Sequence, residues 1–419
     1  MPQISAPAAI TLGYIIAFLN LPLVQAQLVI EWRDTEALII KAEIVGVQGN
    51  ALVDTGATAF VVTEEMAEKI LSNRKSNSVT IRTLTGGRVG REFENVDMQI
   101  AGLSQRTGPV VTIPDRDLDR IGQIYGRDLP FCVGMPILEN CVLSFENQCA
   151  VVSESVSNFP LTGQEYEIEY PATKSPACRC DVGRNRRLMF RIDTGCDSPI
   201  SLESEFAKAL CSSGEAIRVV RNGQIKPGNP EMLVLREVQV FGTVFRNVPA
   251  LTGGINVVGF GLLRHMKFTL DFPNNRVLVP DPPQAGRDWF PIDASGLRIV
   301  RKEDRLTRVR RIVENSSGDD AGLKVDDVII AVNGTPALEM SRYEVEEVLS
   351  KPGTTAHLDI ERDGKALKIG VPLEHPFEYP PKWPPRPQPS KDQLDFEKFL
   401  EEQAASKPPA ESETTPKVE

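Results

Sequence analysis

The chain has 419 residues, of which 41% are hydrophobic and 25% are charged, and its formal net charge is −10. That length exceeds one ordinary hydrophobic core, so we expect two or three folded domains. The acidic balance, without a concentrated basic stripe, argues against nucleic acid as a partner. His265, His357 and His375 are scattered without metal-ligand spacing, so we expect no metal and no cofactor.

Residues 1–26 have the pattern of a secretory signal peptide. Ile10 to Val24 is mostly apolar, and Val24-Gln25-Ala26 offers the small residues that a signal peptidase accepts. The apolar run is shorter than the roughly 20 residues that a spanning helix needs, and no later segment could span a bilayer. We therefore predict export to the periplasm or out of the cell, with a buried strand or a short membrane anchor as the alternatives.

Asp54-Thr55-Gly56 follows two predicted strands, Leu38 to Val45 and Ala51 to Val53. An acid, a small hydroxyl residue and a glycine at the end of an apolar run place a carboxylate on a tight turn. Further along, Gly86 and Gly87 lie in a predicted hairpin, Val79 to Val89. A glycine-tipped hairpin of this kind can close over a substrate as a flap.

Asp193-Thr194-Gly195 is a second copy of the same triplet at the end of another apolar run. An apolar-apolar-glycine element follows each copy, ending at Gly134 after 80 positions (134 − 54) and at Gly259 after 66 positions (259 − 193). This internal repeat predicts two duplicated lobes, residues 27–152 and 153–285, related by a pseudo-twofold axis.

A pseudo-twofold axis would bring Asp54 and Asp193 together between the lobes. Two carboxylates within about 3 Å cannot both ionise, so they share one proton. Such a pair can activate a water and protonate a carbonyl oxygen, which is the chemistry of peptide hydrolysis without a metal.

These residues resemble the retropepsin and pepsin superfamily of aspartic proteases, over about Leu28 to Pro280. The resemblance rests on both triplets, on the Asp-Thr-Gly-Ala form at Asp54 to Ala57, and on the two later glycine elements, Cys132-Val133-Gly134 and Val257-Val258-Gly259. It implies a mainly β fold of two β-barrel-like lobes. It also implies roles for the triplet residues: catalysis by Asp54 and Asp193, bracing by Thr55 and Thr194, and support by Gly56 and Gly195.

Three features depart from that family. Neither flap candidate, at Gly86-Gly87 or at Val219 to Ile225, has the tyrosine found in pepsin-like flaps, and Cys196 follows the second triplet. An insertion between Tyr170 and Arg187 carries Cys178-Arg179-Cys180. A zinc site would need a second Cys or His pair, so we interpret this insertion as a solvated loop.

The seven cysteines leave at least one thiol unpaired in a monomer. Cys141 and Cys149 are a candidate disulfide across a hairpin in an exported protein. No histidine lies in a motif beside a cysteine, which favours buried structural thiols over a catalytic one.

Residues 290–375 differ in composition and resemble a PDZ domain of the type joined to exported bacterial proteases. The resemblance rests on Ala321-Gly322-Leu323 and on Asp327 to Gly334, with Asp326 standing where that family usually has glycine. It implies a groove that binds an extended peptide as an added strand. Ser295-Gly296-Leu297 is the candidate loop for the terminal carboxylate, and the predicted helix Ser341 to Leu349 is the opposite wall. The alternative is a packing module whose groove is filled by its own chain.

Residues 376–419 are rich in proline and charge, which predicts a disordered tail with one short helix, Gln393 to Ala405. The whole sequence thus predicts a monomeric, exported aspartic endopeptidase that acts on peptide or protein substrates. The alternative is a catalytically weak protease-like scaffold whose PDZ domain binds peptides. Pairing of each lobe with another chain is made unnecessary by the duplication.

Overall fold

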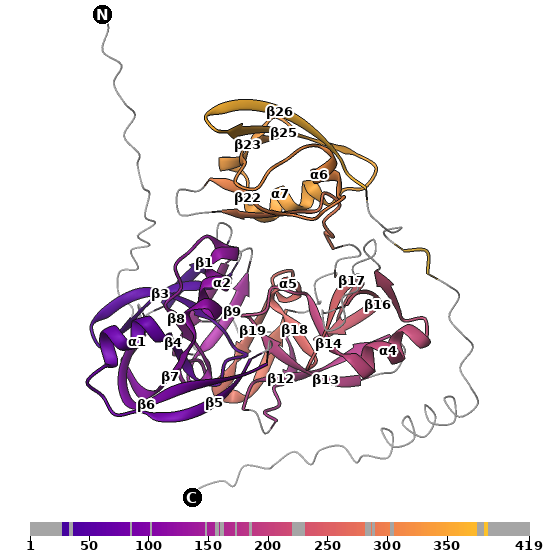
Figure 1. Cartoon of the computed structure of the whole chain (residues 1–419). Coiled ribbons are helices and arrows are strands. Elements are labelled where there is room, and N and C mark those ends of the chain that lie inside the picture. Colours follow the sequence, from indigo (N-terminus) through magenta and orange to yellow (C-terminus); the bar gives the residue numbers. More distant parts are fainter. Residues whose placement is uncertain are drawn as a thin grey trace, which may run out of the picture.

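The computed structural model describes residues 27–32, 37–83, 86–100, 103–146, 149–155, 159, 163–171, 174–183, 187–219, 231–280, 286, 290–301, 306–374 and 381–383. Figure 1 shows two β lobes side by side and a smaller β domain above them. The mainly β fold class is therefore confirmed. Residues 1–26 lie outside the described residues, so export stays a prediction.

Lobe 1 consists of strands and short helices, in chain order β2 (Ile39–Ile44), β3 (Val47–Val53), β4 (Phe60–Thr63), α1 (Glu64–Leu71), β5 (Asn77–Thr83), β6 (Gly86–Ile100), β7 (Arg106–Ile113), α2 (Asp115–Tyr125), β8 (Phe131–Val133) and α3 (Met135–Leu138). The strands form a seven-stranded sheet in the order β2-β3-β8-β4-β7-β6-β5. Because β2 also pairs with β6, the sheet curls into a barrel-like unit.

Lobe 2 repeats this plan with β12 (Ala177–Val182), β13 (Arg187–Asp193), β14 (Ile200–Glu203), α4 (Ser204–Ser212), β15 (Ala216–Val219), β16 (Met232–Val240), β17 (Thr243–Gly253), β18 (Val257–Gly259) and α5 (Phe260–Leu263). Its seven strands follow the order β12-β13-β18-β14-β17-β16-β15, and β12 also pairs with β16. The strand order matches that of lobe 1 position by position, which confirms the internal repeat.

A third sheet joins the lobes and contains β1 (Gln27–Glu31), β9 (Val142–Glu146), β10 (Cys149–Ser153), β11 (Gln164–Glu167), β19 (Phe268–Asp271) and β20 (Arg276–Val279). The order of its six strands is β1-β10-β9-β19-β20-β11, so three come from each half of the protease region. The antiparallel pair β9 and β19 lies at the centre, where the rings of Phe145 and Phe268 stack with centroids 4.4 Å apart. One continuous hydrophobic core therefore runs through both lobes.

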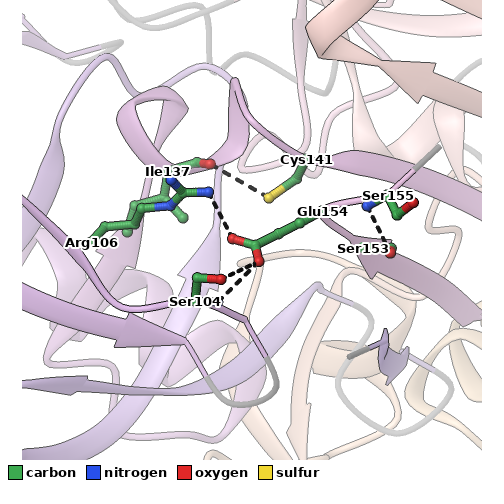
Figure 2. Close-up of polar contacts among 7 residues, drawn as sticks. All are labelled: Ser104, Arg106, Ile137, Cys141, Ser153, Glu154 and Ser155. Atoms are coloured by element: carbon green, nitrogen blue, oxygen red, sulfur yellow. Dashed lines mark hydrogen bonds and ion pairs between the residues drawn. The ribbon is translucent and has the colours of Figure 1, made fainter. Parts of the chain in front are cut away.

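Polar contacts fasten the end of lobe 1 (Figure 2). Glu154, which follows β10, accepts hydrogen bonds from Ser104 and, at 2.7 Å, from Arg106 Nη2. Partial burial acts to raise the pKa of Glu154, but the bonds from Ser104 and Arg106 outweigh it and hold that pKa below its ordinary value. These contacts tie the exit of β10 to the start of β7.

The cysteines lie differently from the sequence expectation. Cys141 and Cys149 are both free thiols, and Cys141 donates to the carbonyl of Ile137 (Figure 2), so the candidate disulfide is not formed. The interpretation of Cys178-Arg179-Cys180 as a solvated loop is wrong, because this segment is strand β12. The two cysteines point into the core with Sγ atoms 3.5 Å apart.

The third domain contains β21 (Leu297–Arg301), β22 (Thr307–Ile312), α6 (Ser317–Asp320), β23 (Val328–Val332), β24 (Thr335–Pro336), α7 (Arg342–Leu349), β25 (Thr355–Arg362) and β26 (Lys365–Pro372). Its main sheet has the order β21-β22-β23-β25-β26, and it has a core of its own. Asp326 has a φ of 72°, in the left-handed region that favours glycine, which explains why glycine is usual there.

Two further expectations concern the ends of the chain. Residues 384–419, including the predicted short helix, lie outside the described residues. Within residues 381–383, however, Trp383 Nε1 donates to Asn247 Oδ1 of lobe 2 at 2.9 Å, and the Arg236 guanidinium lies over its ring. This part of the tail is therefore docked. None of the helices in the described ranges has the length and apolar character of a membrane span.

Candidate active site

The two Asp-Thr-Gly triplets follow equivalent strands. Asp54 comes directly after β3, which pairs in parallel with β8, and its amide donates to the carbonyl of Val133 at 2.9 Å. Asp193 ends β13, where it lies opposite Gly259 of the parallel strand β18. Each apolar-glycine element thus supports one triplet, and the two triplets meet between the lobes.

Reciprocal threonine bonds lock the triplets together. Thr55 Oγ1 donates to the carbonyl of Ile192, and Thr194 Oγ1 donates to the carbonyl of Val53, both at 2.7 Å. Each threonine amide donates to the other threonine hydroxyl at 3.1 Å. Both side chains are almost fully buried, at 0% and 2% exposure, so every polar atom of this network depends on the opposite lobe.

The triplet glycines permit the close approach of the carboxylates. A methyl group on Gly56 would lie 2.5 Å from Asp193 Oδ2, and one on Gly195 would lie 2.5 Å from the Asp54 carboxyl carbon. Any larger residue would push the carboxylates apart. The structure therefore brings together all six triplet residues that the sequence predicts for the site.

The Asp54 carboxyl lies against Gly195 and the Asp193 carboxyl lies against Gly56, so the two acids act on each other's protonation. Asp54 Oδ1 also accepts from the amides of Gly56 (2.8 Å) and Ala57 (3.1 Å), and Asp193 Oδ1 accepts from that of Gly195 (2.9 Å). Desolvation raises the pKa of both carboxyls, and for Asp193 the neighbouring charge of Asp54 raises the pKa further, well above its ordinary value. This is the electrostatic pattern of two acids that hold one proton.

A carboxyl group whose pKa is higher in the folded than in the unfolded protein makes the fold less stable as the pH rises. The contribution of Asp193 is fully present below its unfolded value of 3.8 and is lost as the pH rises through its folded pKa. We therefore expect Asp193→Asn to melt at a higher temperature than the parent at pH 7, by about 2–4 °C per kcal/mol relieved, and this gap to close toward pH 4. Differential scanning calorimetry across this range measures it.

Asp327 provides the control of opposite sign. Burial acts to raise its pKa, but the bidentate pair with Arg362, at 2.7 Å for both bonds, lowers it below 3.8. Its stabilisation is present above pH 3.8 and is lost as the pH falls through the folded pKa, so Asp327→Asn is expected to lower the melting temperature at pH 7. A loss of stability in Asp193→Asn at pH 7 would contradict the raised pKa.

Two residues near the pair were not predicted for the site. Cys132 Sγ lies 3.8 Å from Asp54 Oδ2, and Ser175 Oγ donates to the carbonyl of Gly56 at 3.2 Å. Burial and the nearby carboxylates raise the pKa of Cys132 well above its ordinary value, so it stays a thiol and is a poor nucleophile. Its place could have been found from the repeat, because Val257 occupies the equivalent position in lobe 2.

The flap candidates are only partly described. Gly86 begins β6 and pairs with Thr83 of β5, so both predicted glycines lie in a hairpin. Arg88 of the same strand forms an ion pair with Asp117 of α2, at 3.1 Å between Nε and Oδ2. In lobe 2, residues 220–230 lie outside the described residues, so the second flap candidate stays a prediction.

In the third domain, Ser295, Gly296 and Leu297 form the loop that leads into β21. The amides of Ser295 and Gly296 donate to the Asp293 carboxylate, and the amide of Leu297 donates to Ser295 Oγ at 3.1 Å. The three donors expected to hold a peptide carboxylate therefore already have acceptors within the chain.

Within the described ranges, no three His, Cys, Asp or Glu side chains are grouped as a metal site requires.

A stretch of 83 residues is 37% identical to the "Probable periplasmic serine endoprotease DegP-like" of Chlamydia pneumoniae. The match covers 19% of this chain and only 17% of that protein, which is a serine protease by name.

Family models match two separate parts of the chain. Residues 40–138, which include Asp54 and Gly134, match the family described as "gag-polyprotein putative aspartyl protease". Residues 308–362 match the PDZ domain family. The chain therefore carries a retropepsin-like aspartyl protease domain of the gag type in lobe 1, followed toward the C-terminus by a PDZ domain.

Proposed function

We propose that the chain is an aspartic endopeptidase whose active site is the Asp54 and Asp193 pair. The observation that carries the proposal is the reciprocal network of the buried threonines Thr55 and Thr194, which holds the two triplets face to face and each carboxyl against the other triplet's glycine. A single family match in lobe 1 supplies only half of such a site. The repeated strand order of lobe 2 supplies the other half.

The shared proton defines the two roles. Asp54 accepts two backbone N–H bonds and Asp193 accepts one, so we assign the negative charge to Asp54 and the proton to Asp193. Asp54 removes a proton from the attacking water while Asp193 protonates the substrate carbonyl oxygen, which gives a tetrahedral diol. Collapse of the diol then returns a proton to Asp193 and passes the proton held by Asp54 to the leaving amine, so the pair ends as it began.

The PDZ domain gives this proposal its second part, which is the binding of peptide or protein termini. The domain match and the position of β21 as the edge strand of its sheet support it. Peptide substrates in an extended conformation would be bound by the PDZ domain and cleaved between the two lobes. A PDZ scaffold without catalysis remains the competing function.

An inhibitor profile tests the catalytic class. We expect the purified protein to cleave members of a peptide library, and a statine-type transition-state mimic to suppress cleavage at least about 100-fold, because such mimics resemble the tetrahedral diol. A serine-directed fluorophosphonate, iodoacetamide and EDTA should leave the rate unchanged. The buried thiol of Cys132 makes the iodoacetamide result informative, since it lies next to the pair yet stays protonated.

The same experiment distinguishes the alternatives. Suppression by fluorophosphonate or iodoacetamide would replace the aspartic mechanism with a covalent one. Binding of library peptides without cleavage anywhere between acid and neutral pH would support the scaffold.

A further inference from the structure

Helix α2 interrupts the symmetry of the two lobes. In lobe 1 the chain leaves β7 at Ile113 and enters β8 at Phe131, and α2 fills the gap. In lobe 2 the equivalent strands, β17 and β18, are separated only by residues 254–256. Among the described elements, α2 therefore has no counterpart in the repeat, although Leu118 and Tyr125 of α2 pack on lobe 1 in a hydrophobic cluster with Leu52, Val61 and Cys132.

Helix α2 packs against β21 of the PDZ domain. In the described sheet β21 is the edge strand, paired only with β22, and α7 flanks it. A peptide that binds a PDZ domain adds itself to this edge as a further strand. Figure 1 shows that the side of the PDZ domain with β22 and α7 faces the two lobes, so the peptide-binding side faces the protease.

Tyr125, the last residue of α2, anchors this contact. Its side chain is buried, and the guanidinium carbon of Arg342 at the start of α7 lies 5.8 Å from its ring centroid. Burial raises the pKa of Tyr125, the charge of Asp197 raises that pKa further, and the charges of Arg342 and Arg264 lower it. Charged groups of lobe 2 and of the PDZ domain therefore both act on this ring of lobe 1.

A second contact fixes the same end of α7 to lobe 2. The guanidinium carbon of Arg264 lies 4.3 Å from the ring centroid of Tyr343. Between the PDZ domain and lobe 2 there is a cavity of about 670 Å³, lined on the PDZ side by residues that include Gly296, Leu297 and Leu349. The cavity thus opens at the candidate carboxylate loop and offers apolar contacts to a terminal side chain.

We propose that helix α2 closes the peptide groove of the PDZ domain in the resting protein, and that a peptide with a free C-terminal carboxylate and an apolar last residue opens it. Such a peptide would pair with β21, replace the Asp293 carboxylate on the loop amides and displace α2. The inference rests on the peptide-binding role proposed above. Helix α2 also connects the groove to the flap hairpin, because Asp117 of α2 forms an ion pair with Arg88 of β6.

Amide hydrogen exchange on the full-length protein without ligand tests the closure. Arg342→Ala removes the contact with Tyr125, and we expect exchange to rise at least fivefold in residues 115–125 and 297–301 together. Arg342 also pairs with Glu346 at 3.6 Å, so Glu346→Gln controls for that ion pair, and exposed Lys351→Ala controls for loss of a charge. Both controls should leave both segments unchanged. Unchanged exchange in the Arg342 variant, or a rise in only one segment, would overturn the closure.

Peptide capture tests the ligand. The probe is a library of ten-residue peptides attached by their N-termini and ending in an apolar residue, presented with free or amidated C-termini. We expect Arg342→Ala to capture at least tenfold more free-acid peptide than the parent, and neither protein to capture amidated peptide. Tyr125→Leu removes the same contact from the side of α2 and should also capture more free-acid peptide than the parent. Circular dichroism checks that both variants are folded.

The possible failures are distinguishable. Equal capture by the parent and both opening variants would overturn the closure alone. Equal capture of amidated peptide would overturn the carboxylate as the recognised group. If the parent and both opening variants capture no peptide, the peptide-binding role is overturned, and this inference with it. The inhibitor profile still tests the catalytic proposal independently.

Discussion

Asp54→Asn and Asp193→Asn are each expected to reduce peptide cleavage at least about 10³-fold while leaving the fold intact. An amide cannot accept the proton of the attacking water, and a pair with one amide cannot share a proton between two carboxylates. The side-chain shape is unchanged, so the threonine network beneath the pair is retained. Initial rates on the best peptide from a library digest measure the effect.

The matched control is Asp97→Asn, which changes an exposed acid of lobe 1 far from the triplets in sequence. This variant should cleave at the rate of the parent. The double variant Asp54→Asn, Asp193→Asn should be no slower than either single variant, because the two carboxyls act as one unit. Activity that survived either single change would rule out the dyad.

Thr55→Ala and Thr194→Ala are each expected to destabilise the protein by about 2–4 kcal/mol, because each removes two buried bonds between the lobes. In Thr55→Ala the amide of Thr194 and the carbonyl of Ile192 lose their partners. The same change loosens the carboxylates, so kcat/KM is expected to fall at least about tenfold. Urea unfolding and steady-state rates give the two quantities.

Two control variants separate this network from a general effect of removing a threonine. Thr55→Ser keeps the hydroxyl and should retain most of both stability and activity. Thr63→Ala removes a local N-cap, in which Thr63 Oγ1 accepts from the amide of Met66 at 3.3 Å. It should cost about 1 kcal/mol and leave kcat/KM unchanged. A Thr55→Ala protein as active as Thr63→Ala would show that the network does not position the carboxylates.

The site was predictable from sequence because its signal is local and doubled. Each triplet lies at the end of an apolar run, and the chain order of the later glycine elements fixes which strands support it. Strand β12 also has a sequence signal, because the apolar Cys178 and Cys180 alternate with the charged Arg179. In the structure both cysteines point inward and Arg179 points outward. The missing second Cys or His pair argues against a zinc site there, but it does not distinguish a loop from a strand.

Contacts between domains could not be predicted in this way. Helix α2 has acids in its first turn and is followed by Gly126, whose left-handed conformation caps it, so its existence could be inferred from sequence. Its partner could not, because nothing in residues 115–125 specifies an edge strand about 180 positions away. Likewise, the hydrogen bonds from the amides of Ser295 and Gly296 to the Asp293 carboxylate depend on backbone geometry that composition does not encode.

The six-stranded sheet between the lobes has a consequence for how such a site can be assembled. Its central pair, β9 and β19, joins one half of the protease region to the other, with Phe145 stacked on Phe268. A fragment that held only the first half would expose the free edge of β9, and a second copy could pair with that edge to form a homodimer. In the present chain the second half is tethered, and its high effective concentration makes formation of the site independent of dilution. Tethering also frees each half to diverge, and in this chain lobe 1 carries a helix between β7 and β8 that has no counterpart between β17 and β18 of lobe 2.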